Sequence, residues 1–366
     1  MNNSTEADNK APEDIQFRKP ERNKKKKIIG IVVFVILNAV VLYFTAKADF
    51  SKEVPEYTGE PFGLKNVLFM IGALCCVAAV LMAETVKYLL MMKHLGEKVS
   101  FRNAFETAAL GKYYDNITPS GAGGQPFQIW HLHSKGYSAG AASAMPLTGF
   151  VTMQFGFVFL ALIIFVFGEG STDTLPIKIA AYVGAVFYMI APVMIVIAAI
   201  SPRTAAGIAS FFVRAASKIR LLKNPETKIE KTKAALEDYS RSLKKIASNR
   251  RLLISLFLLS VVFHVAMCSL PYFVLHIFGE NIGFFRALSM CVFVYAAITI
   301  VPTPGNSGAA EGSFYILFSR LDTSGLFFAM LLWRFLCYYM FIIIGLGVYG
   351  YGSLEKLLKK KRGDHS

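Results

Sequence analysis

The sequence predicts an all-α polytopic membrane protein with six to eight transmembrane helices and two broken or re-entrant segments in an inverted repeat. Three observations predict this fold class. Hydrophobic residues make up 54% of the 366 residues and the mean hydropathy is +0.47, a composition that soluble domains of this size rarely have. Apolar runs of about 20 residues recur, each long enough to cross a hydrocarbon core of about 30 Å. Basic residues gather in particular loops and at both termini, as expected from the positive-inside rule.

The net charge of +15 follows this topology and does not indicate a nucleic-acid partner. Basic segments on the cytoplasmic side would meet the anionic lipids of the inner leaflet. All five cysteines lie in apolar stretches, where they resemble small buried hydrophobic residues. We therefore predict a multi-pass protein of the bacterial plasma membrane with both termini in the cytoplasm.

The N-terminal half begins with a disordered, basic cytoplasmic tail, residues 1–27, whose length argues against a cleaved signal peptide. The N-terminal membrane half follows at residues 28–200. Its expected spans are residues 28–46, 67–92, 139–167 and 177–200.

A basic cytoplasmic linker at residues 201–251 separates the two membrane halves. It holds thirteen Lys and Arg against four Asp and Glu, which makes it the strongest cytoplasmic marker in the chain. Asn224 and Pro225 suit the start of a helix, and apolar residues then recur every three or four positions up to Ile246. We interpret this amphipathic helix as a connector packed on the protein or on the inner leaflet, in preference to a partner-binding coiled coil.

The C-terminal membrane half covers residues 252–351. Its expected spans are residues 252–277 and 324–351, and residues 352–366 form a basic cytoplasmic tail.

Two stretches, residues 103–139 and 286–320, are too polar and too rich in proline and glycine to form continuous apolar helices. The charge pattern makes the first start and end inside, and the second start and end outside. Their cores resemble each other, with Thr118-Pro119 followed by Gly and Gln125, and Thr303-Pro304 followed by Gly and Glu311. Paired broken segments of this kind indicate a transport site. The alternative is two kinked spans, which raises the number of spans to eight.

Polar side chains in these stretches are the candidate substrate-binding groups, because charge at membrane depth is costly and usually functional. Arg334 joins them from the last span, where its guanidinium needs a phosphate or an acidic residue as its partner. The full set is Lys112, Tyr114, Asp115, Asn116, Ser120, Gln125, Asn306, Ser307, Glu311 and Arg334. Glu84 and Lys87 lie three residues apart in the second span and are a candidate ion pair, structural or coupled to transport, although Lys87 is also near enough to the interface to snorkel.

No enzymatic signature accompanies these residues. His131 and His133 form only half of a metal site, and the glycines near residue 123 do not follow a strand as a dinucleotide-binding loop would. We predict no catalytic residue, no metal and no cofactor, and lean against an enzyme.

Two long motifs resemble a known family. They are Tyr113-Tyr114-Asp115-Asn116-Ile117-Thr118-Pro119-Ser120-Gly121-Ala122-Gly123-Gly124-Gln125-Pro126 and Pro302-Thr303-Pro304-Gly305-Asn306-Ser307-Gly308-Ala309-Ala310-Glu311-Gly312. From about residue 28 to 351, the chain resembles the membrane flippase-like domain of the bacterial lysyl-phosphatidylglycerol synthase/flippase family, in its stand-alone form. The resemblance implies a lipid translocase. In longer members a soluble domain transfers lysine to phosphatidylglycerol, and the fifteen residues after Tyr351 are too few for such a domain.

These observations together lead to one functional expectation and one alternative. We expect a translocase that moves a charged-headgroup lipid between leaflets, such as an aminoacylated phosphatidylglycerol or a polyprenyl-phosphate lipid. The alternative is a phosphatidylglycerol lysyltransferase-type enzyme or its membrane subunit, working with a soluble lipid-modifying partner. The sequence leaves the identity of the lipid, the energy coupling and the oligomeric state open.

Overall fold

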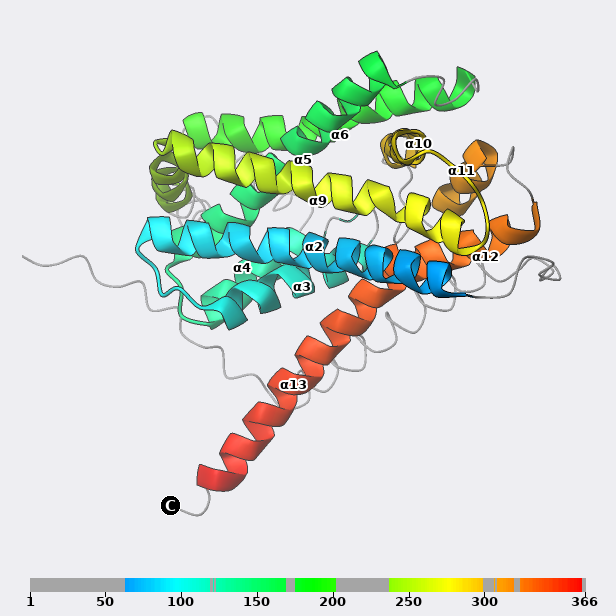
Figure 1. Ribbon diagram of the computed structural model, residues 1–366. Helices are drawn as coiled ribbons and strands as arrows, with labels where there is room; N and C mark the ends of the chain where they lie inside the picture. Colours follow the sequence, from blue (N-terminus) through cyan, green and yellow to red (C-terminus); the bar gives the residue numbers. More distant parts are fainter. Residues whose placement is uncertain are drawn as a thin grey trace, which may run out of the picture. The chain divides into compact units, whose positions relative to one another are not determined.

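The computed structural model describes residues 63–118, 121, 123–168, 175–201, 237–298, 306, 308–318 and 323–363. Five helices in these ranges are long and apolar enough to cross a membrane, which confirms an all-α polytopic membrane protein (Figure 1). They are α2 (Leu64–Leu95), α5 (Ala139–Phe167), α6 (Leu175–Ile200), α9 (Arg250–Ile277) and the last helical stretch. That stretch consists of α12 (Thr323–Arg334), the π-helical turn η1 (Phe335–Tyr339) and α13 (Met340–Gly363). The predicted tail 1–27 and first span 28–46 lie outside the described residues.

Local sequence signals set the ends of several helices. The side chains of Ser100, Ser138 and Asn249 each accept a hydrogen bond from the backbone N–H three residues later, which caps α3 (Phe101–Ile117), α5 and α9. Gly96 ends α2 in the left-handed conformation that glycine adopts without steric cost. These capping residues therefore set where the helices begin and end.

Helices α2 and α9 run antiparallel and side by side (Figure 1). At one end, the Asn66 side chain donates to the carbonyl oxygen of Ile277 at 2.5 Å. At the other end, a ring nitrogen of His94 lies 2.8 Å from the carbonyl oxygen of Lys245, just before α9 begins. The end of α2 therefore lies beside the start of α9, and the start of α2 beside the end of α9.

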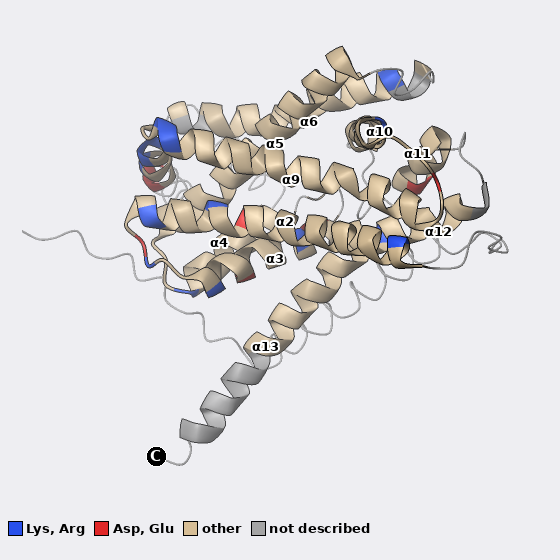
Figure 2. Ribbon diagram, viewed as in Figure 1, with Lys and Arg blue, Asp and Glu red and all other residues tan. Residues whose placement is uncertain are grey.

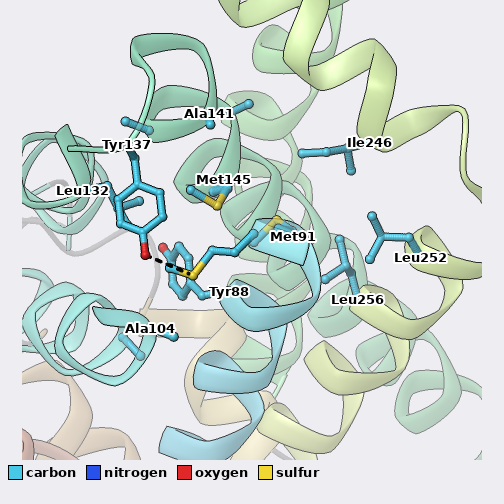
Figure 3. Close-up of a cluster of buried hydrophobic side chains, with 14 of the residues drawn as sticks. Tyr88, Met91, Ala104, Leu132, Tyr137, Ala141, Met145, Ile246, Leu252 and Leu256 are labelled. Atoms are coloured by element: carbon cyan, nitrogen blue, oxygen red, sulfur yellow. Dashed lines mark hydrogen bonds between the residues drawn. The ribbon is translucent and has the colours of Figure 1, made fainter. Parts of the chain in front are cut away.

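A cluster of buried hydrophobic side chains fills the space where the end of α2 meets α5 and the start of α9 (Figure 3). Tyr137 is buried in it, and its hydroxyl donates to the carbonyl oxygen of Lys98 at 2.8 Å. Tyr239 and Ile246, from the helical residues 237–247, are buried in the same cluster. The described part of the predicted amphipathic helix thus packs on the protein as a connector; the rest of it lies outside the described residues.

The first broken segment forms a hairpin of α3 (Phe101–Ile117) and α4 (Gly124–Ser134). Seventeen and eleven residues give helices of about 25 and 16 Å, too short to span the membrane. The hairpin closes on itself, because Glu106 near the start of α3 pairs with Lys135 just after α4, at 2.6 Å between Oε2 and Nζ. The chain therefore returns to the end at which it entered, as a re-entrant segment does.

The second broken segment forms a hairpin of α10 (Phe284–Ile298) and α11 (Ala309–Phe318). It starts after the end of α9, and α12 begins beside that same end, since a Cβ on Gly325 would lie 2.8 Å from the carbonyl oxygen of Phe278. Because α2 and α9 are antiparallel, the two hairpins enter from opposite ends. Helix packing repeats as well: α2 packs on α3, α3 on α4 and α4 on α5, and likewise α9 on α10, α10 on α11 and α11 on α12. The predicted inverted arrangement of broken segments is present among the described residues, where each segment forms a helical hairpin; that the hairpins are re-entrant in the membrane stays a prediction.

Basic residues gather at the end where α2 stops and α9 starts (Figure 2). They include Lys93 at the end of α2, Arg102 in α3, Lys135 after α4, and Arg250 and Arg251 at the start of α9. The placement of this end in the cytoplasm stays a prediction from the positive-inside rule.

The closure of the first hairpin can be tested at Glu106. Burial alone would raise the pKa of its carboxyl group, but Lys135, Arg102 and His131 together hold this pKa below its ordinary value of 4.5. A lowered folded-state pKa means that the ion pairs stabilise the fold above pH 4.5 and that this stabilisation is lost as the pH falls through the lower value. We expect Glu106→Gln to cost about 1–3 kcal/mol at neutral pH and to flatten the acid dependence of thermal unfolding in detergent.

The matched control is Asp238→Asn, which breaks a pair of exposed side chains whose Asp238 Oδ1 and Arg241 Nη2 lie 3.8 Å apart. It should change the unfolding free energy by less than about 0.5 kcal/mol. Equal effects of the two substitutions would contradict the role given to Glu106.

Candidate functional site

A cavity of about 560 Å³ lies at the tips of both hairpins. Asn116 and Gly121 reach it from the first hairpin, and Asn306 and Ala310 from the second. Its remaining walls come from α2, α5, α6, α9 and the stretch around Arg334. The volume is typical of a small-molecule site, and the location between two inverted half-helices is typical of a transport site.

The tip of the first hairpin is closed by its own side chains. Asp115 Oδ1 accepts from the backbone N–H of Gly124 at 3.0 Å, and Thr118 Oγ1 accepts from that of Gly123 at 2.9 Å. A Cβ on either glycine would collide with these two side chains, so glycine is required for so close a turn. The N–H groups of Gly123 and Gly124, at the start of α4, are thereby satisfied.

The tip of the second hairpin is closed in a corresponding way. Asn306 and Gly308 take positive φ angles of 53° and 86°, and Glu311 Oε2 accepts from the backbone N–H of Gly308 at 2.5 Å. A carboxylate thus caps the returning half-helix in both hairpins, from Asp115 in one and Glu311 in the other. The two acids occupy equivalent roles, although the motif comparison had placed Gln125 opposite Glu311.

Glu311 also forms a buried ion pair with Arg334, through Oε1 and Nε. The Arg334 guanidinium lies 4.6 Å from the centroid of the Tyr338 ring, a cation–π contact. Arg334 is the last residue of α12, directly before the π-helical turn η1. π-Helical turns inside α-helices are frequent at functional sites.

The first hairpin is attached to this same turn. Asn116 Nδ2 donates to the carbonyl oxygen of Tyr338 at 3.1 Å, and the Tyr338 hydroxyl donates to the carbonyl oxygen of Asn116 at 3.2 Å. A short chain of contacts therefore runs from the tip of α3 through η1 to Arg334 and Glu311 in the second hairpin.

Glu84 and Lys87 form a second buried ion pair, at 2.6 Å between Oε1 and Nζ. Lys87 is fully buried, and its Nζ also donates to the Gly149 carbonyl oxygen and the Ser260 hydroxyl, at 3.3 and 3.2 Å. It ties α2 to α5 and α9 and does not snorkel to the interface. Glu84 lines the cavity, while Lys87 stands behind it.

The structure brings most of the predicted site residues to one place. Those that line the cavity are Glu84, Lys112, Asp115, Asn116, Gln125, Asn306 and Arg334. The Lys112 ammonium is held 4.7 Å from the centroid of the Phe263 ring. Glu311 contacts the lining through Arg334. Ser120 and Ser307 lie outside the described residues.

Tyr114 is placed away from the cavity lining. Its ring stacks on Phe127 at a centroid distance of 3.5 Å, and its hydroxyl contacts that of Tyr349. The residue fastens α3 to α4 and α13, which is a packing role.

Several polar lining residues were missed by the sequence analysis. They are Gln128, Gln154, Tyr188, His264 and Tyr295. Gln154 and His264 carried a usable signal, since each is a polar residue in the middle of an apolar span. A ring nitrogen of His264 lies 3.0 Å from the carbonyl oxygen of Met153, which joins α9 to α5 at the cavity wall.

Two comparisons with known proteins bear on this arrangement. The family described as "Lysylphosphatidylglycerol synthase TM region" matches residues 27–345. A "UPF0104 membrane protein" of Archaeoglobus fulgidus is 24% identical over 341 residues, which covers 92% of this chain and 99% of that protein. With the five apolar helices, these matches identify a multi-pass membrane protein.

The buried pair in α2 allows a test of its structural contribution. Lys87→Met leaves the Glu84 carboxylate buried without its partner, and we expect a loss of about 3–5 kcal/mol in thermal unfolding measured in detergent. Adding Glu84→Gln should restore much of this loss, because the double variant carries no buried charge there.

Lys65→Met is the control on the same helix, because Lys65 is exposed at its start. If the double variant is as unstable as Lys87→Met alone, the loss of stability does not come from the unpaired Glu84 carboxylate.

Proposed function

Because this chain belongs to the lysylphosphatidylglycerol synthase transmembrane-region family, we propose that it is a translocase that moves a charged-headgroup lipid between the two leaflets. One observation carries the proposal: a polar cavity lies where two re-entrant hairpins from opposite ends meet. Such an arrangement can expose one site to either side in turn by small movements of the hairpins.

The contents of the cavity suit a lipid headgroup. Lys112 and Arg334 supply positive charge, and Glu84 and Asp115 supply negative charge, among amide and hydroxyl groups. Charge of both signs in a space of about 560 Å³ favours a polar head of moderate size, while acyl chains remain against the exposed apolar faces of the long helices. Phospholipid heads are more readily accommodated than a long oligosaccharide on a polyprenyl carrier.

Charges of the site have separate roles in this proposal. Arg334 binds the phosphate of the lipid, since a guanidinium matches phosphate oxygens in charge and geometry. Glu84 and Asp115 receive an amino group of the head or a coupling proton. Glu311 holds Arg334 in place between transport events.

A second candidate function follows from the word "synthase" in the family description. In that case the chain is the membrane part of a lipid-modifying transferase, and a soluble partner brings the activated amino acid. The cavity would then hold the acceptor lipid rather than carry it across.

Leaflet exchange in liposomes tests the first proposal against the second. Purified protein is reconstituted with a fluorescent phospholipid, and a membrane-impermeant quencher reports the lipid in each leaflet. Parallel samples receive lysyl-tRNA and are assayed for lysine incorporation into phosphatidylglycerol, with and without a soluble cell fraction. Exchange without incorporation supports the translocase, and incorporation without exchange overturns it in favour of the second candidate.

Arg334 is the residue on which exchange should depend most. We expect Arg334→Met combined with Glu311→Gln to slow exchange by roughly 10- to 100-fold, because a charged contact to the lipid is lost. Substituting both partners avoids leaving a buried carboxylate unpaired, so the fold should survive, as thermal unfolding will show.

Arg286→Ala is the matched control, since Arg286 is exposed on α10 and does not line the cavity. Normal exchange by the folded double variant would remove Arg334 from the site.

A further inference from the structure

The chain has two tryptophans in contrasting surroundings. Trp130 on α4 is 54% exposed, whereas Trp333 on α12 is 1% exposed and lines the cavity beside Arg334. The Trp333 ring packs on Phe314 of α11 at a centroid distance of 4.9 Å and meets the Tyr295 ring of α10 edge-on at 6.4 Å. Aromatic rings of the second hairpin therefore fix its orientation.

The indole N–H of Trp333 is buried and has no hydrogen-bond partner among the described residues. An indole nitrogen can only donate, and buried donors nearly always find an acceptor. Because Trp333 lines the cavity, we take an occupant of the cavity as the source of the missing acceptor.

The two charged side chains near Trp333 do not accept from its indole N–H. Arg334 follows it and carries only donors, and Glu311, the nearby acid, already accepts from Gly308 and pairs with Arg334. The N–H groups of Gly123 and Gly124 at the other hairpin tip are likewise taken up by Thr118 and Asp115. We therefore take an oxygen of the ligand as the acceptor of this N–H.

We propose that the Trp333 indole N–H and the Arg334 guanidinium together form the subsite for a phosphate group of the ligand. This inference rests on the proposed function and names which part of the cavity holds the phosphate. Trp333 favours ligands that carry a hydrogen-bond acceptor at that position over ligands that lack one, because only the former satisfy its N–H.

Fluorescence of Trp333 gives a direct measure of occupancy. Trp130→Phe leaves Trp333 as the single tryptophan, and this variant is titrated in detergent with dihexanoyl-phosphatidylglycerol, with dihexanoylglycerol and with inorganic phosphate. We expect the phospholipid to change the Trp333 emission saturably and dihexanoylglycerol, which lacks phosphate, to leave it unchanged. A response to inorganic phosphate as well would show that the phosphate group alone suffices, and its absence that the glycerol backbone is also needed; both support the subsite. An equal response to dihexanoylglycerol, or no response to the phospholipid, overturns it.

Trp333→Phe tests the N–H itself, because it removes the donor and keeps most of the ring. We expect its affinity for dihexanoyl-phosphatidylglycerol, measured by isothermal titration calorimetry, to fall about tenfold relative to Trp130→Phe. Thermal unfolding of both variants reports whether the fold is retained. Unchanged affinity in folded Trp333→Phe overturns the subsite.

Leaflet exchange by the same proteins separates this inference from the proposed function. If Trp130→Phe exchanges lipid and Trp333→Phe does so equally well with unchanged affinity, the subsite is wrong and the translocase stands. If Trp130→Phe and the unmodified chain bind the phospholipid but exchange none, the translocase is wrong and the subsite stands.

Discussion

A polar group at membrane depth must find its partner within the protein, because the hydrocarbon supplies none. This constraint governs both hairpin tips, where the helical hydrogen-bond ladder is interrupted. Asp115 and Thr118 satisfy the N–H groups that begin α4, and Glu311 does the same before α11. The buried cations obey it too, since Lys87 and Arg334 each pair with a carboxylate. Without these internal partners, the irregular backbone that encloses the cavity would not be tolerated.

The antiparallel packing of α2 and α9 explains why the two hairpins are inverted relative to each other. Each of these helices is followed by a hairpin that begins at its end, so their opposite directions send the hairpins in from opposite ends. The tips of the two hairpins meet at one cavity. The polar site is therefore a consequence of how two ordinary apolar helices pack.

Residue types alone predict the two hairpins, but not the contacts between residues that are distant in the sequence. Proline and glycine exclude a continuous helix wherever they cluster, so both hairpins could be found without knowing any contact. Partners distant in sequence could not be derived in this way, because nothing near Asn116 indicates a bond to Tyr338. Tyr114 shows the same limit, since its position in the motif gives no sign of its contacts with Phe127 of α4 and Tyr349 of α13. Gln154 and His264 were visible as polar residues inside apolar spans.

The π-helical turn η1 has a mechanical consequence. It is bonded to both hairpins. Arg334, directly before the turn, pairs with Glu311 of the second hairpin, and Tyr338 within the turn is hydrogen-bonded to Asn116 of the first. Withdrawing the tip of α3 would break both bonds to Tyr338 at once and release a segment whose wide turn can tighten by one residue. Such tightening would turn Arg334 about the helix axis, so the position of the α3 tip and the direction of this cation are linked.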